Sequence, residues 1–384
     1  MKNTIAHYMA QPNKGDTHQI LNVSMIIMLS IIYKKVIVYA PKECCEDLKI
    51  QLSQKKIQII NKIVFIPNKI YFKSPILFWI SCGLQTFKTI YKAQPSDILY
   101  FSTLNPIMFP MFNLWCYLSH KDMYTLCHND LEYLITPKFG KINLHWHLIN
   151  FIFKNMQFAT HNHLIVLGDS IKNNLKGIIP SKKINKNIIS ICHPYYSNSI
   201  HQISKVNPSN QYFKIGIVGA IKKKDLEQIK IINKILDTYP NIKMYSISIS
   251  QEDLSQYNNL INLNKKNKHL ERWEYDQIIT TMDALYYPYP SSSYTLSASG
   301  AVYEAIVKGI PIISIENPYF KWLFQTFGNL GFLYNDIRDL DNILKRLKNK
   351  EEIDKIKINA QKASIYINPL NYYKILESKI HNSI

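Results

Sequence analysis

Glycine and charged side chains are both scarce in this chain of 384 residues, which has only 11 glycines and 19% charged residues. Hydrophobic residues make up 47% of the sequence and aromatic residues 12%, a composition that argues against disorder and indicates a folded globular protein. With so few glycines, we expect each one to lie where the backbone does not tolerate a side chain. Gly300 and Gly309 flank Glu304, and residues 297–313 are therefore a segment with special backbone requirements.

The sequence also lacks the marks of secretion and of a membrane span. Its six cysteines have no CxxC spacing, and the neighbouring Cys44 and Cys45 are poorly placed to pair, which predicts buried free thiols in a reducing cytoplasm. The N-terminus has neither the apolar region nor the cleavage site of a signal peptide. Residues 98–119 carry no charge, but Asn105 and Pro110 within them favour a buried strand, loop and helix over a span.

Negative charge is the scarcer sign, because Asp plus Glu number 27 against 46 Lys plus Arg, a formal net charge of +19. Such an excess attracts anionic partners, which include nucleic acid, an anionic membrane face and phosphorylated substrates. The abundance of Lys, Ile and Asn is also what an AT-rich genome would encode, so the charge alone does not choose among these partners.

Short apolar runs alternate with longer amphipathic stretches along most of the chain. We expect ten of these runs to be strands: residues 34–41, 62–67, 97–102, 123–128, 164–170, 187–194, 214–220, 242–248, 283–289 and 310–316. The alternation predicts an α/β protein with two parallel, Rossmann-like sheets, because ten strands are too many for one ordinary small sheet. The polar segment 197–211 is the expected boundary, and the end of the chain is expected to form an amphipathic helix.

Residues 283–315 form one unit in this scheme, with a strand, a Ser-rich loop, a helix over 300–308 and a second strand. The helix is expected to bury one face, made of Ala301, Val302, Ala305 and Ile306, and to place Glu304 on another. Gly309 is expected to adopt the left-handed conformation that ends the helix before Pro311.

The start of that helix is a candidate binding site. Ser299 and Gly300 are expected to cap it and to present backbone N–H groups to a phosphate. Glu304, about one turn later, is then placed to accept hydrogen bonds from a ribose. The alternative is that Ser299 is only an N-cap and Glu304 a solvated helix residue.

The segment 297–313 resembles the nucleotide-sugar motif of family 4-type (group 1) glycosyltransferases of bacterial surface polysaccharide biosynthesis. The likeness extends over residues 212–336 and, through "LCHNDLEYL" and "NHLIVLGDSIKNNL", into the first half of the chain. It implies a GT-B fold, in which two Rossmann-like domains face a central cleft and a C-terminal helix returns to the N-domain. The resemblance assigns residues 1–200 to an acceptor-side domain, 201–367 to a nucleotide-sugar-binding domain and 368–384 to the crossover helix.

The chain departs from the family motif at one of its two glutamates. Those glutamates are separated by seven residues, and Glu304 matches the second, whereas Leu296 stands at the position of the first. The resemblance places the first glutamate toward the sugar. Its loss leaves the identity of the donor and the stereochemical outcome open.

The resemblance also assigns the residues that hold the diphosphate. Ala220 stands after Gly219, where the family often has Arg, so Lys222 or Lys224 is expected to supply the phosphate charge at a shifted position. Gly15 is expected to let an N-domain loop approach the diphosphate, with an ordinary turn as the alternative.

His128 and Asp130 follow a predicted strand at its carboxyl end, where ligand sites of α/β proteins gather. If the enzyme inverts, Asp130 or His128 is the candidate general base. If it retains, the resemblance implies that His128 donates a hydrogen bond to the donor sugar. A capping Asp130 and an ordinary polar His128 are the alternative.

Three short motifs suggest metal binding at first sight: "HWH" at 145–147, "HNH" at 161–163 and "DLD" at 339–341. The first lies in an apparently helical stretch where side chains at i and i+2 diverge, and the third fits a helix N-cap better. We therefore predict no metal and no cofactor, since backbone N–H groups and lysines can stabilise a diphosphate leaving group.

These patterns lead to one expected function and two alternatives. The expected one is a cytoplasmic hexosyltransferase, peripheral on the inner membrane face, that uses a nucleotide sugar, expected to be a UDP-sugar, and a lipid-linked or growing surface glycan. The alternatives are a GT-B-like nucleotide-sugar epimerase and a basic nucleic-acid-binding protein. The nucleic-acid-binding alternative ranks last because the sequence lacks RNA- and DNA-recognition motifs, so no nucleic-acid partner is expected.

Overall fold

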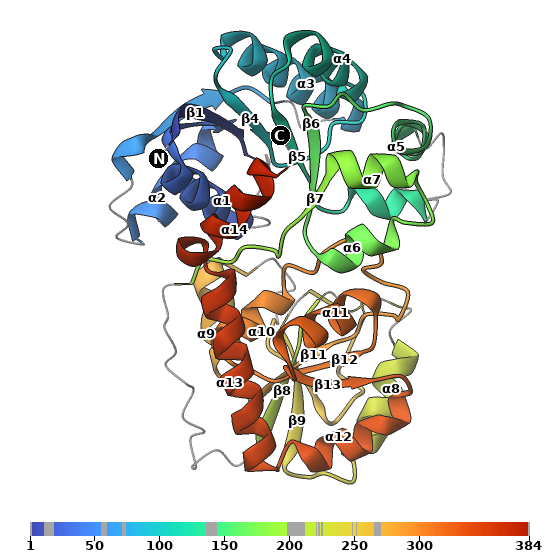
Figure 1. The fold of residues 1–384 in the computed structure, drawn as a ribbon. Helices are drawn as coiled ribbons and strands as arrows, with labels where there is room; N and C mark the ends of the chain where they lie inside the picture. The colour runs from blue at the N-terminus through green and yellow to red at the C-terminus, as the bar shows by residue number, and fades with distance from the viewer. Residues whose placement is uncertain are drawn as a thin grey trace. The chain divides into compact units, whose positions relative to one another are not determined.

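The computed structural model divides the chain into two compact units (Figure 1). Unit 1 comprises Met1–Tyr196, Tyr294–Ala298 and Ile367–Ile384, and unit 2 comprises Ser197–Ser293 and Ser299–Tyr366. The residues that the structure describes are 2–10, 19–54, 60–70, 74–135, 144–197, 212–219, 221, 223, 226–247, 249–250, 252–264 and 270–382.

Unit 1 is built on a parallel sheet of seven strands in the order β3-β2-β1-β4-β5-β6-β7. The strands are β1 (Lys2–Met9), β2 (Tyr33–Pro41), β3 (Ile63–Asn68), β4 (Ile98–Phe101), β5 (Met123–Cys127), β6 (Asn162–Val166) and β7 (Ile188–Ser190). The strand order reverses between β1 and β4. In a doubly wound sheet, the carboxyl ends of two such strands form the crevice where ligands bind.

Helices cover this sheet (Figure 1), because packing against it buries both their own apolar faces and the apolar side chains of the strands. They are α1 (Gln19–Ile32), α2 (Lys42–Gln54), α3 (Pro75–Lys92), α4 (Phe109–Ser119), α5 (Leu144–Lys154), α6 (Asp169–Asn174) and α7 (Ser181–Asn187), with short 3₁₀ turns at Ile60–Lys62 and Asp130–Leu134. The C-terminal helix α14 (Pro369–His381) belongs to the same unit. Its Tyr372 hydroxyl accepts a hydrogen bond from the backbone N–H of Cys192 at 2.6 Å, so the predicted return of the last helix is confirmed.

Unit 2 holds a parallel sheet of six strands in the order β10-β9-β8-β11-β12-β13, which reverses between β8 and β11. The strands are β8 (Phe213–Ile217), β9 (Ile242–Ser246), β10 (Leu260–Asn262), β11 (Ala284–Tyr287), β12 (Ile312–Ile315) and β13 (Gly331–Tyr334). The helices are α8 (Leu226–Leu236), α9 (Arg272–Thr280), α10 (Val302–Lys308), α11 (Pro318–Phe327), α12 (Leu340–Arg346) and α13 (Lys350–Ile367), with a 3₁₀ turn at Ile337–Asp339. Isoleucines from β8, α8 and β12 pack into its core.

The prediction of two parallel Rossmann-like sheets is confirmed, and each of the ten predicted strands overlaps an observed strand. Residues 98–119 form the predicted strand, loop and helix, as β4 and α4. All six cysteines are buried free thiols, as predicted. Among the described residues, no helix is both long enough and apolar enough to cross a membrane.

Three strands were not predicted: β1, β10 and β13. β1 has Thr, His and Asn in place of an apolar run, yet it lies in the middle of the sheet. Its buried His7 is tolerated there because one ring nitrogen lies 3.0 Å from a carboxylate oxygen of Asp97 and the other lies 3.0 Å from the Tyr39 hydroxyl. These two hydrogen bonds compensate the His7 ring for the hydrogen bonds to water that it loses on burial.

Candidate active site

The reversal of strand order in unit 2 brings two residues together at the carboxyl ends of β8 and β11. Gly219 follows β8 with a φ of 104°, a conformation that side chains rarely adopt. A Cβ atom at Gly219 would lie 3.3 Å from the ring of Tyr289, which follows β11. The predicted glycine is therefore required both by its backbone conformation and by the close approach of this ring.

Helix α10 begins later than predicted and is not capped by Ser299. Its N-cap position is Ala301, which makes no side-chain capping bond, and the Ser299 hydroxyl is buried without a hydrogen-bond partner. The carbonyl of Gly300 accepts from the N–H of Tyr303 at 3.3 Å. The Tyr287 hydroxyl of β11 donates to the carbonyl of Ala301 at 3.1 Å, which ties the start of the helix to the strand. The expectation that Ser299 caps the helix is wrong.

The expectation of a single buried face on α10 is also wrong, because Val302 through Val307 are all buried. This includes Glu304, which is 7% exposed, so the alternative of a solvated helix residue does not hold. Gly309 does end the helix in the left-handed conformation, with φ 65° and ψ 29°, and its N–H is bonded to carbonyls of the last turn. That prediction is confirmed.

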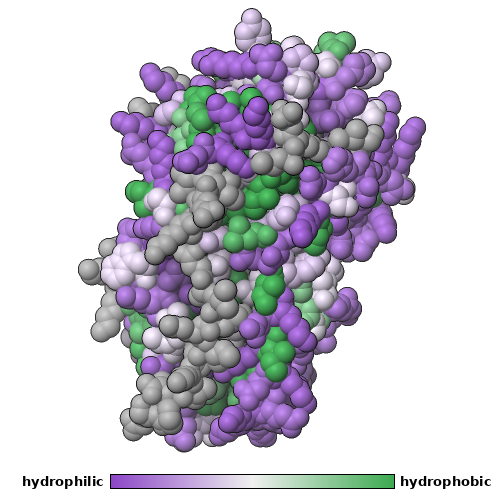
Figure 2. Space-filling view, turned by 60° about the vertical axis from the view of Figure 1, so that its left-hand side comes forward, coloured by the Kyte–Doolittle hydropathy of each residue, from purple (hydrophilic) through white to green (hydrophobic). Residues whose placement is uncertain are grey.

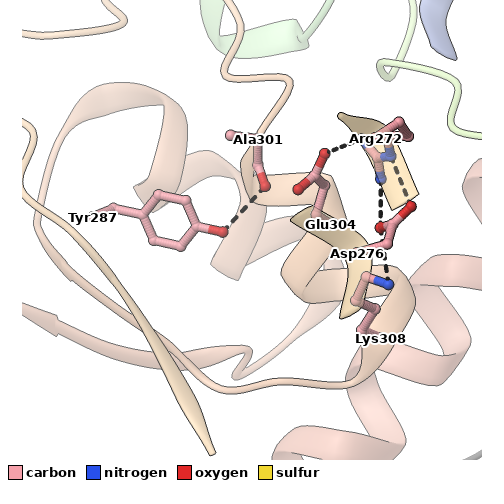
Figure 3. Close-up of polar contacts among 6 residues, drawn as sticks. All are labelled: Arg272, Asp276, Tyr287, Ala301, Glu304 and Lys308. Atoms are coloured by element: carbon pink, nitrogen blue, oxygen red, sulfur yellow. Dashed lines mark hydrogen bonds and ion pairs between the residues drawn. The ribbon is translucent and has the colours of Figure 1, made fainter. Parts of the chain in front are cut away.

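Glu304 belongs to a network of four charged side chains from α9 and α10 (Figure 3). Arg272 donates from Nη1 to Glu304 Oε1 at 2.7 Å. The same guanidinium donates from Nε and Nη2 to both carboxylate oxygens of Asp276, each at 2.8 Å. Lys308 Nζ lies 3.1 Å from Asp276 Oδ1. The planar fork of Arg272 thus fixes both carboxylates and holds Glu304 in one orientation.

The surroundings shift the pKa of one member of this network, Asp276, and that of the neighbouring Tyr275. Burial alone would raise the pKa of Asp276, but hydrogen bonds and charge from Arg272 and Lys308 outweigh it and lower that pKa. Burial, with the negative charge of Glu304 as the second cause, raises the pKa of Tyr275 well above its ordinary value. Near neutral pH Asp276 is therefore ionised and Tyr275 is neutral.

Three residues assigned to the diphosphate by the family resemblance, Gly15, Lys222 and Lys224, lie outside the described residues, as does Ala220 at the position of the family's Arg. Lys223, between the two lysines, is described and is exposed. The described part of the predicted donor site thus consists of Gly219, Ser299, Gly300 and Glu304. Arg272 joins them as a residue that was not predicted.

In unit 1, two candidate catalytic residues lie together at the carboxyl end of β5. His128 and Asp130 are both buried, and the ring of His128 meets that of His193 edge to face, with centroids 5.9 Å apart. His193 follows β7, and its Nδ1 lies 3.0 Å from the carbonyl oxygen of Pro194. A cavity of about 20 Å³, enough for a single water, lies at the ends of β1, β4 and β5.

Burial raises the pKa of Asp130 to about 7, although backbone N–H groups of Leu104, Asp130 and His128 lower it in part. A carboxyl group with this pKa exchanges its proton near neutral pH, which suits a general base. The alternative of a capping residue is not supported, because Asn129 rather than Asp130 occupies the N-cap position of the turn Asp130–Leu134.

Leu296, at the position of the missing glutamate, lies in a loop that packs within unit 1. The chain leaves unit 2 after Ser293, contributes Tyr294–Ala298 to unit 1 and returns to unit 2 at Ser299. Glu132 Oε1 accepts from the N–H of Leu296 and from the hydroxyl of Ser297, both at 2.9 Å. Asn174 donates to the carbonyl of Thr295 at 2.8 Å. A carboxylate therefore does lie beside this position, but Glu132 supplies it.

Arg272 and Glu132 are the two site residues that sequence reasoning missed. The i,i+4 spacing of Arg272 and Asp276 was a signal for an ion pair on a helix, but nothing in the sequence links either residue to Glu304. Glu132 accepts hydrogen bonds from residues that lie 164 and 165 positions later in the chain, so no local pattern points to it.

The metal-like motifs have other contacts. His161 is bonded to Asp122 at 2.9 Å, and the ring of His163 stacks on Tyr124 with centroids 5.0 Å apart. Asp341 accepts from the Tyr239 hydroxyl and from Lys345, while Asp339 occupies the N-cap position of α12. In the described ranges, no three His, Cys, Asp or Glu side chains form a group that could hold a metal ion.

The chain matches no protein-family model and no curated protein sequence. Solved structures share its fold. The catalytic domain of starch synthase IV from Arabidopsis thaliana, solved with ADP and acarbose bound, matches with a TM-score of 0.60 and 9% identity over 100% of this chain and 99% of that one. A glycosyltransferase from Rickettsia africae ESF-5 matches with a TM-score of 0.58 and 12% identity over 98% of both chains.

A putative UDP-N-acetylglucosamine 2-epimerase from Listeria monocytogenes also matches, with a TM-score of 0.50 and 12% identity over 93% of this chain and 91% of that one. These likenesses establish the GT-B fold for this chain.

Proposed function

We propose that this protein transfers a hexose-type sugar from a nucleotide-sugar donor, a UDP-sugar, to a lipid-linked or growing cell-surface glycan. The observation that carries the proposal is the buried Glu304. It lies in the first turn of α10, after β11, and accepts a hydrogen bond from Arg272 of α9. A buried carboxylate is costly unless it is paired, and here the carboxylate and its guanidinium partner lie together near the end of the sheet where α/β proteins bind ligands. The shared GT-B fold supports the same function.

Glu304 is the proposed partner of the ribose. An ionised carboxylate accepts about four hydrogen bonds, more than the bonds to Arg272 and to the Tyr275 side chain use, so ribose hydroxyls can add to them. Ser299 and Gly300, just before the helix, and Gly219, after β8, are the proposed phosphate contacts together with Lys222 or Lys224. These groups would stabilise the negative charge that builds on the diphosphate when the glycosidic bond breaks.

His128 and Asp130 are the proposed catalytic residues on the acceptor side. If transfer inverts the anomeric centre, Asp130 takes the proton from the acceptor hydroxyl, because its pKa of about 7 allows it to act as a base at neutral pH. If transfer retains it, His128 donates a hydrogen bond to the donor sugar. The proposed location is the cytoplasmic side of the inner membrane, where such acceptors and anionic lipid meet the basic chain.

The melting temperature of purified protein with UDP, GDP, CMP or ADP, in the presence of EDTA, tests the donor site. We expect one nucleotide, UDP, to raise the melting temperature, since a ligand that binds only the folded state stabilises it. Glu304→Ala should weaken that shift. Glu304→Gln, which keeps an acceptor oxygen toward Arg272, is the matched variant, and Lys308→Ala is the control for changes in the network outside the ribose contact.

No shift with any nucleotide would contradict the proposal, as would an equal shift in wild type and Glu304→Ala. Loss of the shift in Lys308→Ala as well would assign the effect to the ion network and not to Glu304.

An epimerase is the second candidate, because the Listeria protein shares the fold. An epimerase needs no glycan acceptor, so incubation with nucleotide sugars alone separates the two functions. A sugar isomer formed without acceptor would favour the epimerase, whereas transfer that requires an acceptor would favour the glycosyltransferase.

A further inference from the structure

Hydrophobic side chains reach the surface at several places, as the patches among hydrophilic residues in Figure 2 illustrate for one face. The most regular set lies on α3 of unit 1: Leu77, Ile80, Leu84, Phe87 and Tyr91, with exposed fractions between 38% and 82%. These positions are spaced by three and four residues in turn, so they form one stripe along one side of the helix. At about 1.5 Å per residue the stripe is roughly 21 Å long.

Helix α4 exposes a second apolar set: Met111, Leu114, Tyr117 and Leu118, with exposed fractions between 46% and 67%. α4 contains no charged residue, so its solvent-facing side has only apolar and aromatic groups with a few polar ones. The two helices are neighbours, since the rings of Phe87 and Trp115 lie 6.3 Å apart and Gly83 packs against Met108. We call the nine exposed residues of α3 and α4 together the α3–α4 face.

The exposed charges that the described part of residues 69–120 contributes are of one sign. From Lys69 to His120 the sequence has four lysines, at positions 69, 73, 88 and 92, and a single carboxylate, Asp97. Asp97 is buried and lies 3.0 Å from a ring nitrogen of His7, whereas Lys69, Lys88 and Lys92 are exposed. Anionic groups would therefore meet lysines beside the apolar stripe and no exposed carboxylate of this segment.

We propose that the α3–α4 face docks on an anionic lipid bilayer, with its apolar side chains in the boundary between headgroups and acyl chains and Lys88 and Lys92 against lipid phosphates. An apolar helix face bordered by lysines has the pattern of a helix that lies in the plane of a membrane. Contiguous exposed apolar surface is unfavourable in water and marks an interaction site. Each lysine near an anionic surface contributes attraction, which falls with salt.

A second copy of the chain fits this face less well. A two-fold interface would bring the lysines of one copy toward those of the other with no exposed carboxylate of this segment to pair with them, and such like-charge contact is unfavourable. The lipid phosphates of a membrane provide the missing negative charge. The surface does not depend on Glu304 or on sugar transfer, so it can be tested separately from the proposed function.

Co-sedimentation of the full-length protein with vesicles tests the proposal. We expect binding to vesicles of phosphatidylcholine with phosphatidylglycerol, and at least about tenfold weaker binding to phosphatidylcholine alone. The variant Leu84→Glu/Leu114→Glu should lose about tenfold or more of its binding, because it places two carboxylates in the face. Lys88→Gln/Lys92→Gln should bind less and show a weaker dependence on salt.

Ile50→Glu is the matched control, since Ile50 on α2 and Leu84 on α3 are both 54% exposed. We expect it to bind within about twofold of wild type. All variants should keep the wild-type melting temperature and its shift with nucleotide, which separates lipid binding from the donor site and from misfolding. Every substituted side chain is exposed, so we expect all variants to fold. If Leu84→Glu/Leu114→Glu nevertheless fails to fold, Lys88→Gln/Lys92→Gln still tests the proposal.

Three results would overturn the proposal. Wild-type protein that ignores anionic vesicles has no such docking surface. Equal loss in Ile50→Glu and Leu84→Glu/Leu114→Glu would mean that added negative charge alone weakens binding. A lipid-free dimer, seen by light scattering, that Leu84→Glu/Leu114→Glu converts to monomers would assign the face to a second copy of the chain.

Discussion

The carboxyl ends of the two sheets hold acidic residues of opposite character. In unit 1, Asp130 is buried with only backbone donors to compensate, and its pKa rises to about 7. In unit 2, Glu304 is equally buried but receives a guanidinium at 2.7 Å, within a network that lowers the pKa of Asp276. Burial without a cation raises the pKa of Asp130 toward neutral pH, whereas the neighbouring Arg272 and Lys308 lower the pKa of Asp276 despite its burial.

The difference matches the two roles proposed above, proton transfer for Asp130 and ribose binding for Glu304. A general base must gain and lose a proton during turnover, which the environment of Asp130 allows. The proposed contact to ribose needs a fixed orientation, which the hydrogen bond from Arg272 provides for Glu304. Sequence reasoning listed both carboxylates as site residues but did not show that Glu304 has a guanidinium partner.

The largest expected effect concerns the pH dependence of stability in unit 1. The folded-state pKa of Asp130 lies above its unfolded value of 3.8, so the folded state binds more protons between those two values and stability falls as pH rises through them. Asp130→Asn removes this penalty. We expect the variant to gain on the order of 3 to 4 kcal/mol relative to wild type between about pH 4 and pH 8. Urea unfolding at both pH values measures this gain, and a constant difference would contradict the raised pKa.

Activity of the same residue is the next largest effect. Asp130→Asn and His128→Ala should each lower turnover by about tenfold to hundredfold if they act in the chemistry, up to about 2.7 kcal/mol of barrier. Wild-type turnover should rise with pH through about 7 if the Asp130 carboxylate is the base. Rates unchanged in both variants would remove the assignment.

In unit 2, Arg272→Ala should lower the free energy of unfolding by about 2 kcal/mol, because it leaves buried Glu304 without its guanidinium. Lys308→Ala should cost less than about 1 kcal/mol, since Asp276 keeps both bonds to Arg272. Thermal unfolding of the two variants compares them directly. Equal losses would mean that Glu304 is not the member of the network that requires a cation.

The loop Tyr294–Ala298 provides a smaller test. Glu132→Ala removes the acceptor for Leu296 and Ser297 and should cost about 1 kcal/mol, with faster hydrogen exchange at the Leu296 amide. Glu132→Gln keeps an oxygen for both donors and should exchange nearly as slowly as wild type. Hydrogen exchange measured by mass spectrometry distinguishes the two, and unchanged exchange in Glu132→Ala would show that other contacts hold the loop.

Glycine substitutions give the smallest effects. Gly309→Ala should cost about 1 kcal/mol, because its φ of 65° is unfavourable for alanine although no atom lies within 4 Å of the added Cβ. Gly177→Ala in unit 1 also has open space and no positive φ, so it should be neutral or slightly stabilising. A melting temperature lowered equally by both would refute the left-handed requirement at Gly309.

Local chemistry explains which features the sequence predicted. Uninterrupted apolar runs such as that of β12 predicted strands, and glycine before Ile310 and Pro311 predicted the end of α10. β1 was missed because His7 is acceptable in a central strand only when Asp97 and Tyr39 are placed beside it by the fold.

The site was predicted less completely for the same reason. Glu304 was recognised from its motif, but its cation comes from a helix 32 residues earlier in the chain. Ser299 fits the pattern of an N-cap, yet the N-cap position is Ala301, two residues further on. The Ser299 hydroxyl is buried and makes no capping hydrogen bond. Contacts made by tertiary packing leave no trace in local spacing.

The five-residue excursion of the chain into unit 1 also limits how such proteins can recombine. A chimaera that takes residues 197–366 from another chain as one continuous segment brings that chain's version of Tyr294–Ala298, which must fit Glu132 and Asn174 of the recipient. An exchanged segment must therefore supply a loop that can form these hydrogen bonds with the recipient's residues. We expect functional hybrids to arise mainly where the loop and its two partners are inherited together.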